Sequence, residues 1–147
     1  MKYSAPLSVL ALVLLVPYVA ACQETPTLPR SNAPEDAQVY IIAPADGETV
    51  SATFSVKFGL QAMGIAPAGI EMENTGHHHL LVDLDAMPNV GLPLPATDNI
   101  RHFGKGQTET TLTLPPGTHT LQLLLGDHIH IPHDPPVMSE KITITVK

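Results

Sequence analysis

The chain is 147 residues long and carries 7 basic and 14 acidic side chains, which give a formal net charge of −7 at pH 7. This acidic balance argues against binding nucleic acid or anionic lipid through a charged surface. Only one cysteine is present, so an internal disulfide is excluded.

The first 21 residues are typical of a bacterial secretion signal. Lys2 is the only charge before Glu24, and a mainly apolar run from Pro6 to Ala21 follows it. The run is shorter than the ~20 apolar residues that a membrane-spanning helix needs, and a basic start with a short apolar middle indicates a signal peptide. Residues 19–22, Val-Ala-Ala-Cys, resemble the lipobox of bacterial lipoproteins. We expect cleavage before Cys22 and acylation of that cysteine; the alternative is an ordinary signal peptide with a chance cysteine.

The same resemblance implies a location and a domain organisation. Residue 23 is Gln, whereas lipoproteins kept in the inner membrane of Gram-negative bacteria usually have Asp there. The protein is therefore expected in the cell envelope, anchored by lipid to the outer membrane and facing the periplasm. Residues 22–37 are rich in Pro, Thr, Ser and acids and are expected to form a flexible tether. Residues 38–147 suffice for one domain with one core.

The mature part of the sequence predicts β-strands and almost no helix. Its prolines are spread almost evenly, which leaves no helix-length window without Pro or a period of two. Apolar and polar residues alternate, or β-formers cluster, at 39–42, 54–60, 77–83, 108–114, 119–125 and 142–146. Residues 61–75 and 84–106 are predicted to be mostly irregular. About seven short strands in about 110 residues predict an all-β, antiparallel, immunoglobulin-like β-sandwich.

Six of the eight histidines lie in two short clusters. The first is His77 to His79, and the second spans residues 128–133 between Asp127 and Asp134. Imidazole is the commonest protein ligand for copper and zinc. A His-x-His pair on a strand places both rings on one face, and both clusters contain such a pair.

The predicted topology brings the two clusters together. The first cluster opens a strand, and the second follows the strand expected to be its antiparallel neighbour. The sequence therefore predicts a copper or zinc site whose ligands are His77, His79, His128 and His130, with His133 or Asp127 as a fifth or supporting group. Met63 and Met72 in the preceding loop would add a copper(I) option. Imidazoles with the ordinary pKa near 6.5 would lose the metal below about pH 6.

The remaining histidines have other expected roles. His119 opens the strand that the second cluster follows, so it should lie at the opposite end with a structural role. His78 shares a face with Leu80 and is expected in the core. The turn at residues 102–107 could bring His102 or Gln107 towards the site.

Three stretches resemble the bacterial domain-of-unknown-function family numbered 4399. They are residues 75–83, residues 102–110, and residues 116–121 taken with 125–128. The resemblance covers roughly residues 38–147, and the family usually has Gly where this chain has Lys105. It implies an exported single domain and no particular activity. The His/Asp loop before the last strand is more loosely similar to periplasmic copper carriers, which use an amino-terminal His where this chain has Cys22.

Nothing in the sequence favours an enzyme. No Gly-x-Ser-x-Gly elbow or phosphate-binding loop is present, and the cysteine is assigned to lipid. The alternative to metal binding is an interaction module that docks an envelope protein or a glycan, with structural histidines. Converging imidazoles would favour the metal site, whereas rings bonded to backbone carbonyls would favour the module.

Replacing Cys22 with Ser removes the acceptor for the lipid. The Cys22→Ser variant should accumulate as an unlipidated precursor that no longer partitions with membranes, as measured by metabolic labelling and fractionation. Maturation and fractionation like the unaltered protein would refute the anchor.

Overall fold

The computed structural model describes residues 28–147, which contain nine β-strands and no helix. The expected signal peptide and Cys22 lie outside the described residues. Within this range no helix is long and apolar enough to span a bilayer. The strands are β1 (Gln38–Ala43), β2 (Thr49–Val50), β3 (Thr53–Gln61), β4 (Gly64–Ile65), β5 (Thr75–Val82), β6 (Ile100–His102), β7 (Glu109–Thr113), β8 (Gly117–Gly126) and β9 (Ile142–Val146).

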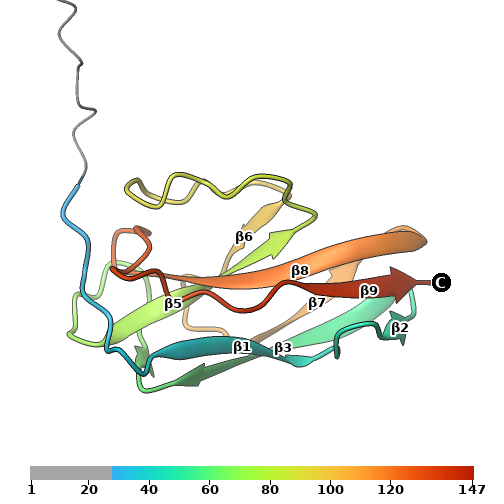
Figure 1. The fold of residues 1–147 in the computed structure, drawn as a ribbon, viewed down its shortest axis with the longest axis horizontal. Coiled ribbons are helices and arrows are strands. Elements are labelled where there is room, and N and C mark those ends of the chain that lie inside the picture. Colours follow the sequence, from blue (N-terminus) through green and yellow to red (C-terminus); the bar gives the residue numbers. More distant parts are fainter. Residues whose placement is uncertain (1–27) are drawn as a thin grey trace, which may run out of the picture.

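The strands form two sheets that pack face to face (Figure 1). One sheet has the order β1-β3-β7, and the other has the order β2-β9-β8-β5-β4. The short strand β6 pairs with β5 on the edge that β4 also uses. All pairings among the longer strands are antiparallel, and the order is that of an immunoglobulin-type sandwich. The predicted all-β sandwich is confirmed.

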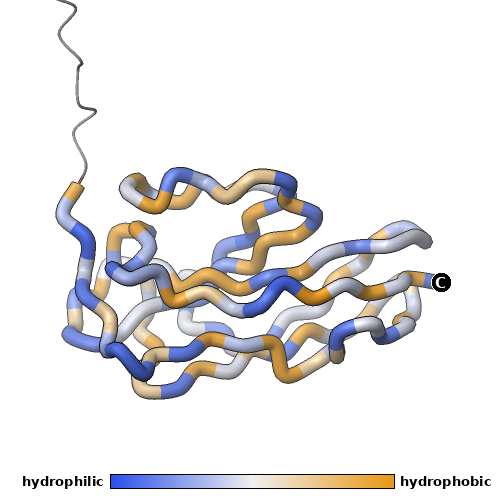
Figure 2. The backbone as a smooth tube through the Cα atoms, viewed as in Figure 1, coloured by the Kyte–Doolittle hydropathy of each residue, from blue (hydrophilic) through white to orange (hydrophobic). Residues whose placement is uncertain are grey.

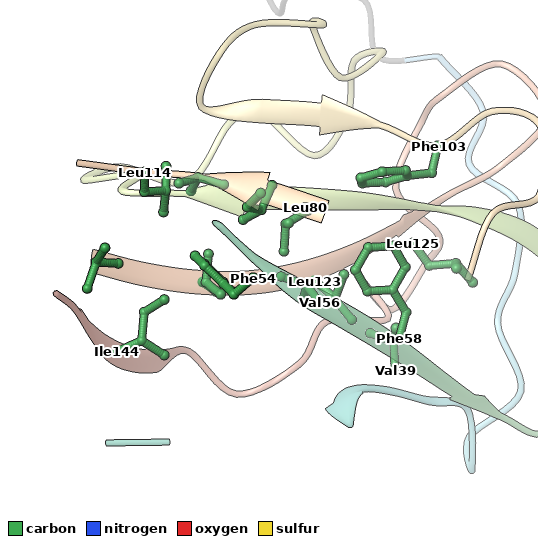
Figure 3. Close-up of a cluster of buried hydrophobic side chains, with 14 of the residues drawn as sticks. Val39, Phe54, Val56, Phe58, Leu80, Phe103, Leu114, Leu123, Leu125 and Ile144 are labelled. Atoms are coloured by element: carbon green, nitrogen blue, oxygen red, sulfur yellow. The ribbon is translucent and has the colours of Figure 1, made fainter. Parts of the chain in front are cut away.

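One apolar core lies between the sheets. Side chains of both sheets point into it, with Phe58 of β3 packed against Phe103 at 4.9 Å between ring centroids (Figure 3). Hydrophobic and hydrophilic segments alternate along β1 and β3 (Figure 2), because one face of that sheet meets the core and the other meets water. The alternating apolar residues of the predicted strands are expected in the core, and Ile142 among them is half-buried. The others are buried: Phe54, Val56, Phe58, Leu80, Val82, Leu121, Leu123 and Ile144.

Strands β5 and β8 are buried on both faces. Leu80 and Leu123 face the main core, whereas Leu81 and Leu124 belong to a second, smaller cluster on the outer face. Residues 84–100 cover that outer face and contribute Leu94 and Ile100 to the cluster. The segment 84–106, expected to be mostly irregular, thus contains β6, and its part up to residue 100 forms a cover over the outer face of β5.

The segment before β1 lies against the domain, unlike the free tether expected up to residue 37. It runs beside the loop that follows β8 (Figure 1). The Ala33 amide donates to the Asp134 carbonyl at 3.1 Å, and the Asp134 amide donates to the Ser31 carbonyl at 2.9 Å. Arg30 donates to the carbonyls of Pro132 and His133. Backbone pairing of this kind extends the folded region back to about residue 30.

Leu123 tests the core, because it is fully buried in the central strand β8. Leu123→Ala should lower the free energy of unfolding by roughly 2–5 kcal/mol, through lost burial and the cavity left behind. Urea denaturation of both proteins measures the change. The exposed Thr111, on the solvent face of β7, is the control, and Thr111→Ala should change stability by under about 1 kcal/mol.

Candidate metal centre

Three histidines meet on the outer face of the second sheet. His77 and His79 lie two residues apart on β5, so their side chains point to the same face. His79 is paired across the sheet with His102 of β6, which brings a third ring alongside. One ring nitrogen from each of the three lies within 4.8 Å of the other two.

A fourth ring completes the cluster from the loop after β8. The His130 ring centroid is 5.0 Å from that of His77 and 4.6 Å from that of His102. The His79 ring is 4.8 Å from His77 and 5.1 Å from His102. We call His77, His79, His102 and His130 the four-histidine cluster.

Two glycines provide the space that the rings occupy. A Cβ atom on Gly126 would come within 2.7 Å of the His79 ring, and one on Gly104 would overlap the His102 ring. Gly126 stands opposite His77 in the β5–β8 pairing. Any larger residue at Gly126 or Gly104 would displace a ring of the cluster.

Asp127 shapes the loop that presents His130. Its carboxylate accepts hydrogen bonds from the amides of Ile129 at 3.0 Å and Ile131 at 2.9 Å, and from the Ser31 hydroxyl at 2.9 Å. His130 itself has a φ of 71°, in the left-handed region that side chains other than Gly seldom adopt. Such a conformation costs of order 1–3 kcal/mol, so the position of this imidazole lowers the stability of the fold.

The two inner rings are buried without hydrogen-bond partners. His77 and His79 are both fully buried, and among the described residues neither ring nitrogen of either one has a partner. A buried polar group without a partner costs about 1–3 kcal/mol, and native proteins contain few of them. Four such atoms in two adjacent side chains are therefore unusual, and a bound metal ion would satisfy one on each ring.

His77, His79 and His102 are held in the neutral form that binds metals. Burial lowers the pKa of His77 to about 4, and repulsion from His102 and His130 contributes. Burial also lowers the pKa of His79 to about 3, with repulsion from His77 and His102 next in size. The pKa of His102 is lowered by burial and by His130. Neutral imidazoles at neutral pH have free lone pairs for an ion.

The arrangement fits copper or zinc in its donor set and nearly in its spacing. Imidazole nitrogens around one tetrahedral ion would be ~3.3 Å apart, given metal–nitrogen bonds of about 2.0–2.1 Å. The donors of His77, His79 and His102 lie within 4.8 Å, so small ring movements would close the site. His102 is exposed and His130 is half-buried, so the cluster reaches the surface at these two rings.

The structure brings together three of the ligands predicted from the sequence and separates the other three. His77, His79 and His130 lie in the cluster, whereas His128, His133 and Asp127 do not. Asp127 is occupied as the hydrogen-bond acceptor of its loop. His133 bonds through Nε2 to the Thr75 carbonyl at 3.1 Å. The alternation that put His128 beside His130 holds only for an extended strand, but residues 128–130 form a turn.

His102 is the cluster member that the predicted ligand set omitted. It lies on β6, whose three residues are too few to show periodicity. The available signal was the neighbouring Gly104, which the structure shows making room for the ring. Gln107, the other candidate from this turn, accepts a hydrogen bond from the Lys105 amide at 2.9 Å and caps the turn.

The remaining histidines and methionines lie away from the cluster. His78 is buried against Phe58, with 5.1 Å between the ring centroids, as expected for a core residue. His119 has its Nδ1 2.7 Å from the Asp83 carboxylate and its Nε2 2.9 Å from the Pro115 carbonyl, and the hydrogen bond to Asp83 raises its pKa. Met63 packs against the core, and Met72 is exposed.

Comparison with known proteins supports the resemblance seen in the sequence. The family model described as a domain of unknown function, DUF4399, matches residues 56–147. This region includes all four histidines of the cluster. No curated protein and no solved structure matches the chain. The chain therefore belongs to the DUF4399 family.

Proposed function

We propose that this domain binds a transition-metal ion, copper or zinc, through His77, His79 and His102, with His130 as the fourth ligand. The observation that carries the proposal is the convergence of three imidazoles within 4.8 Å, two of them buried with no other partner for their nitrogens. A metal ion is the ligand that imidazole clusters of this kind bind best.

The hydrogen bonds of the other histidines help to decide between a metal site and an interaction module with structural histidines. His78, His119 and His133 each have a ring nitrogen near a backbone carbonyl, as expected of structural histidines. The buried rings of His77 and His79 have no such bond. If this pair had only a structural role, nothing would offset the free-energy cost of burying their nitrogens without partners. A bound metal ion would offset that cost.

The proposed role is carriage or storage of the ion in the cell envelope rather than catalysis. Four imidazoles would fill a tetrahedral shell, whereas catalytic zinc sites keep one position open for water or substrate. The envelope location is part of the proposal and rests on the signal peptide and on acylation of Cys22. In that setting the metal would be bound at the outer face of a membrane-tethered domain.

Metal binding should stabilise the fold, because an ion that binds only the folded state shifts the unfolding equilibrium. With free zinc or copper(II) about a hundredfold above the dissociation constant, the gain is about 2.7 kcal/mol. His102→Ala, which changes an exposed residue, should abolish most of the thermal shift, and so should His79→Leu. Differential scanning fluorimetry with and without metal, in the Cys22→Ser background so that no thiol competes, measures this.

Controls separate the cluster from the other histidines. His119→Gln should lower the melting temperature but keep the metal-induced shift, because His119 bonds to Asp83 and Pro115 instead. His130→Gly should lower the affinity for the metal, because a ligand is lost. It should also stabilise the metal-free fold, since Gly adopts a positive φ at little cost. A full shift that survives both His102→Ala and His79→Leu would overturn this ligand set.

The lowered pKa values predict the acid behaviour of the metal-free protein. In the unfolded chain these histidines titrate near pH 6.5, but in the fold His77 and His79 titrate at about 4 and 3. As the pH falls below 6.5 the unfolded chain takes up protons that the folded one does not, so stability is lost. By about pH 5 a loss of ~2 kcal/mol is expected for each of the two histidines. His79→Leu should show a shallower loss in urea titrations across this range.

The same values change the expected acid limit of metal binding. Ordinary imidazoles would release metal below about pH 6, but protons compete with the ion only near the pKa of the folded site. His77 and His79 should therefore lose little of their contribution to the affinity between about pH 7 and pH 5.5. Calorimetry should show a smaller loss of affinity over that interval than a site made of ordinary imidazoles would give, and a loss as large as that of ordinary imidazoles would show that the buried pair does not hold the ion.

A further inference from the structure

The segment before β1 contacts the loop that carries the proposed fourth ligand (Figure 1). We call residues 30–33 the amino-terminal strap and residues 127–133 the ligand loop. The Ser31 hydroxyl of the strap donates to Oδ2 of Asp127, the first residue of the loop, at 2.9 Å. Asp127 is 2% exposed, so its carboxylate depends on such donors rather than on water. The strap therefore holds the start of the loop.

The strap also holds the end of the ligand loop. Arg30 donates from Nε to the Pro132 carbonyl at 2.9 Å, and its guanidinium donates to the His133 carbonyl. One residue further, the amide and the carbonyl of Asp134 both pair with the backbone of the strap. One short stretch of chain thus fixes both ends of the loop whose middle residue is His130.

The position of the His130 ring depends on how its loop is held. Its φ of 71° is a conformation that persists only where the surrounding contacts enforce it. Oδ1 of Asp127 accepts from the amides of Ile129 and Ile131, the residues on either side of His130. Ser31 holds the other oxygen of the same carboxylate. A chain of hydrogen bonds therefore leads from the strap to the backbone that aims the fourth imidazole.

Two other contacts support the ligand loop from the rest of the domain. The Gly69 amide donates to the His128 carbonyl at 2.8 Å, and the Leu94 amide donates to the His130 carbonyl at 2.9 Å. They hold two carbonyls of the loop and do not involve the carboxylate that organises its turn. Loss of the strap contacts should therefore loosen the turn around His130 without unfolding the domain.

We propose that Ser31 and Arg30 are positioning residues for the metal ion: the docked strap holds the His130 imidazole in place as the fourth ligand. A strap that detaches lowers the affinity of the four-histidine cluster. This inference rests on the proposed function and names a regulation of the same site. Hydrogen-bond partners that orient metal ligands typically change the affinity by about 10–100-fold. Ser31 acts at one remove from the ligand, so the effect expected of it is about tenfold.

The coupling acts in both directions. If docking of the strap raises the affinity for the ion, a bound ion stabilises the docked strap by the same factor. The Asp134 amide reports on docking, because its bond to the strap must open before it exchanges with solvent. Zinc should slow this exchange several-fold. The Gly47 amide, bonded to the Thr143 carbonyl at the other end of the domain (Figure 1), should exchange at the same rate with and without zinc.

Calorimetric titration with zinc tests the proposal, using the full chain with Cys22→Ser in detergent as the parent. Ser31→Ala should weaken zinc binding about tenfold, and Arg30→Ala should weaken it too. Ser31→Thr keeps the hydroxyl and should restore the affinity. The control Ser139→Ala removes a buried hydroxyl outside the loop, which accepts from the Leu123 amide at 2.9 Å. It should lower the melting temperature and leave the zinc affinity unchanged.

A double-mutant cycle shows whether Ser31 acts through His130. In the His130→Gly background, Ser31→Ala should change the zinc affinity little, because the ligand that it positions is already gone. An equal loss with and without His130 would overturn the positioning role. So would an unchanged affinity in both Ser31→Ala and Arg30→Ala, or an Asp134 amide whose exchange zinc does not slow. A parent that binds no zinc would refute the four-histidine cluster itself, and the positioning role with it.

Discussion

The position of β5 between β8 and β6, with both faces covered, is the constraint on which the rest of this structure depends. A strand sends successive side chains to opposite faces, so the three consecutive histidines at its start are divided. His78 enters the core beside Phe58, while His77 and His79 enter the outer layer. If the pairing of His77 with Gly126 slipped by one residue, the two faces of the strand would be exchanged. His77 and His79 would then enter the apolar core, and His78 would enter the outer layer.

Within residues 28–147 the buried ring nitrogens without hydrogen-bond partners are concentrated at one end of the domain, on His77, His78, His79 and His133. The buried nitrogens of His77 and His79 lack partners, and His130 adopts a positive φ. At the other end His119 is fully bonded between Asp83 and Pro115. Local rules of stability are most often broken at functional sites, where the fold tolerates the energy lost. The contrast between the two ends supports a functional role for the four-histidine cluster.

Much of the architecture could be predicted from the sequence because period-two alternation is long and clear in strands such as β3 and β8. The antiparallel pairing of β5 with β8 followed from the topology, and it brought His77 and His79 towards the loop of His130. His102 was named only as a residue that its turn could bring towards the site, and it was left out of the ligand set because β6 has three residues, too few for a pattern. His128 was grouped with His130 because alternation was assumed for residues that form a turn. Periodicity predicts faces of strands, but it does not predict the direction of a side chain in a loop.

The docking of the segment before β1 affects how far the domain can reach. Ser31 bonds to Asp127, and Asn32 pairs with Asp134, so the chain is fixed to the loop of the histidine cluster from about residue 30 onward. Under the proposed acylation of Cys22, about eight residues separate the lipid from this attachment, and a fully extended chain of that length spans at most ~28 Å. The end that carries the four-histidine cluster would then stay within a shallow layer above the bilayer. Encounters would be confined to that layer, where the effective concentration of a membrane-bound partner is raised by the shared surface.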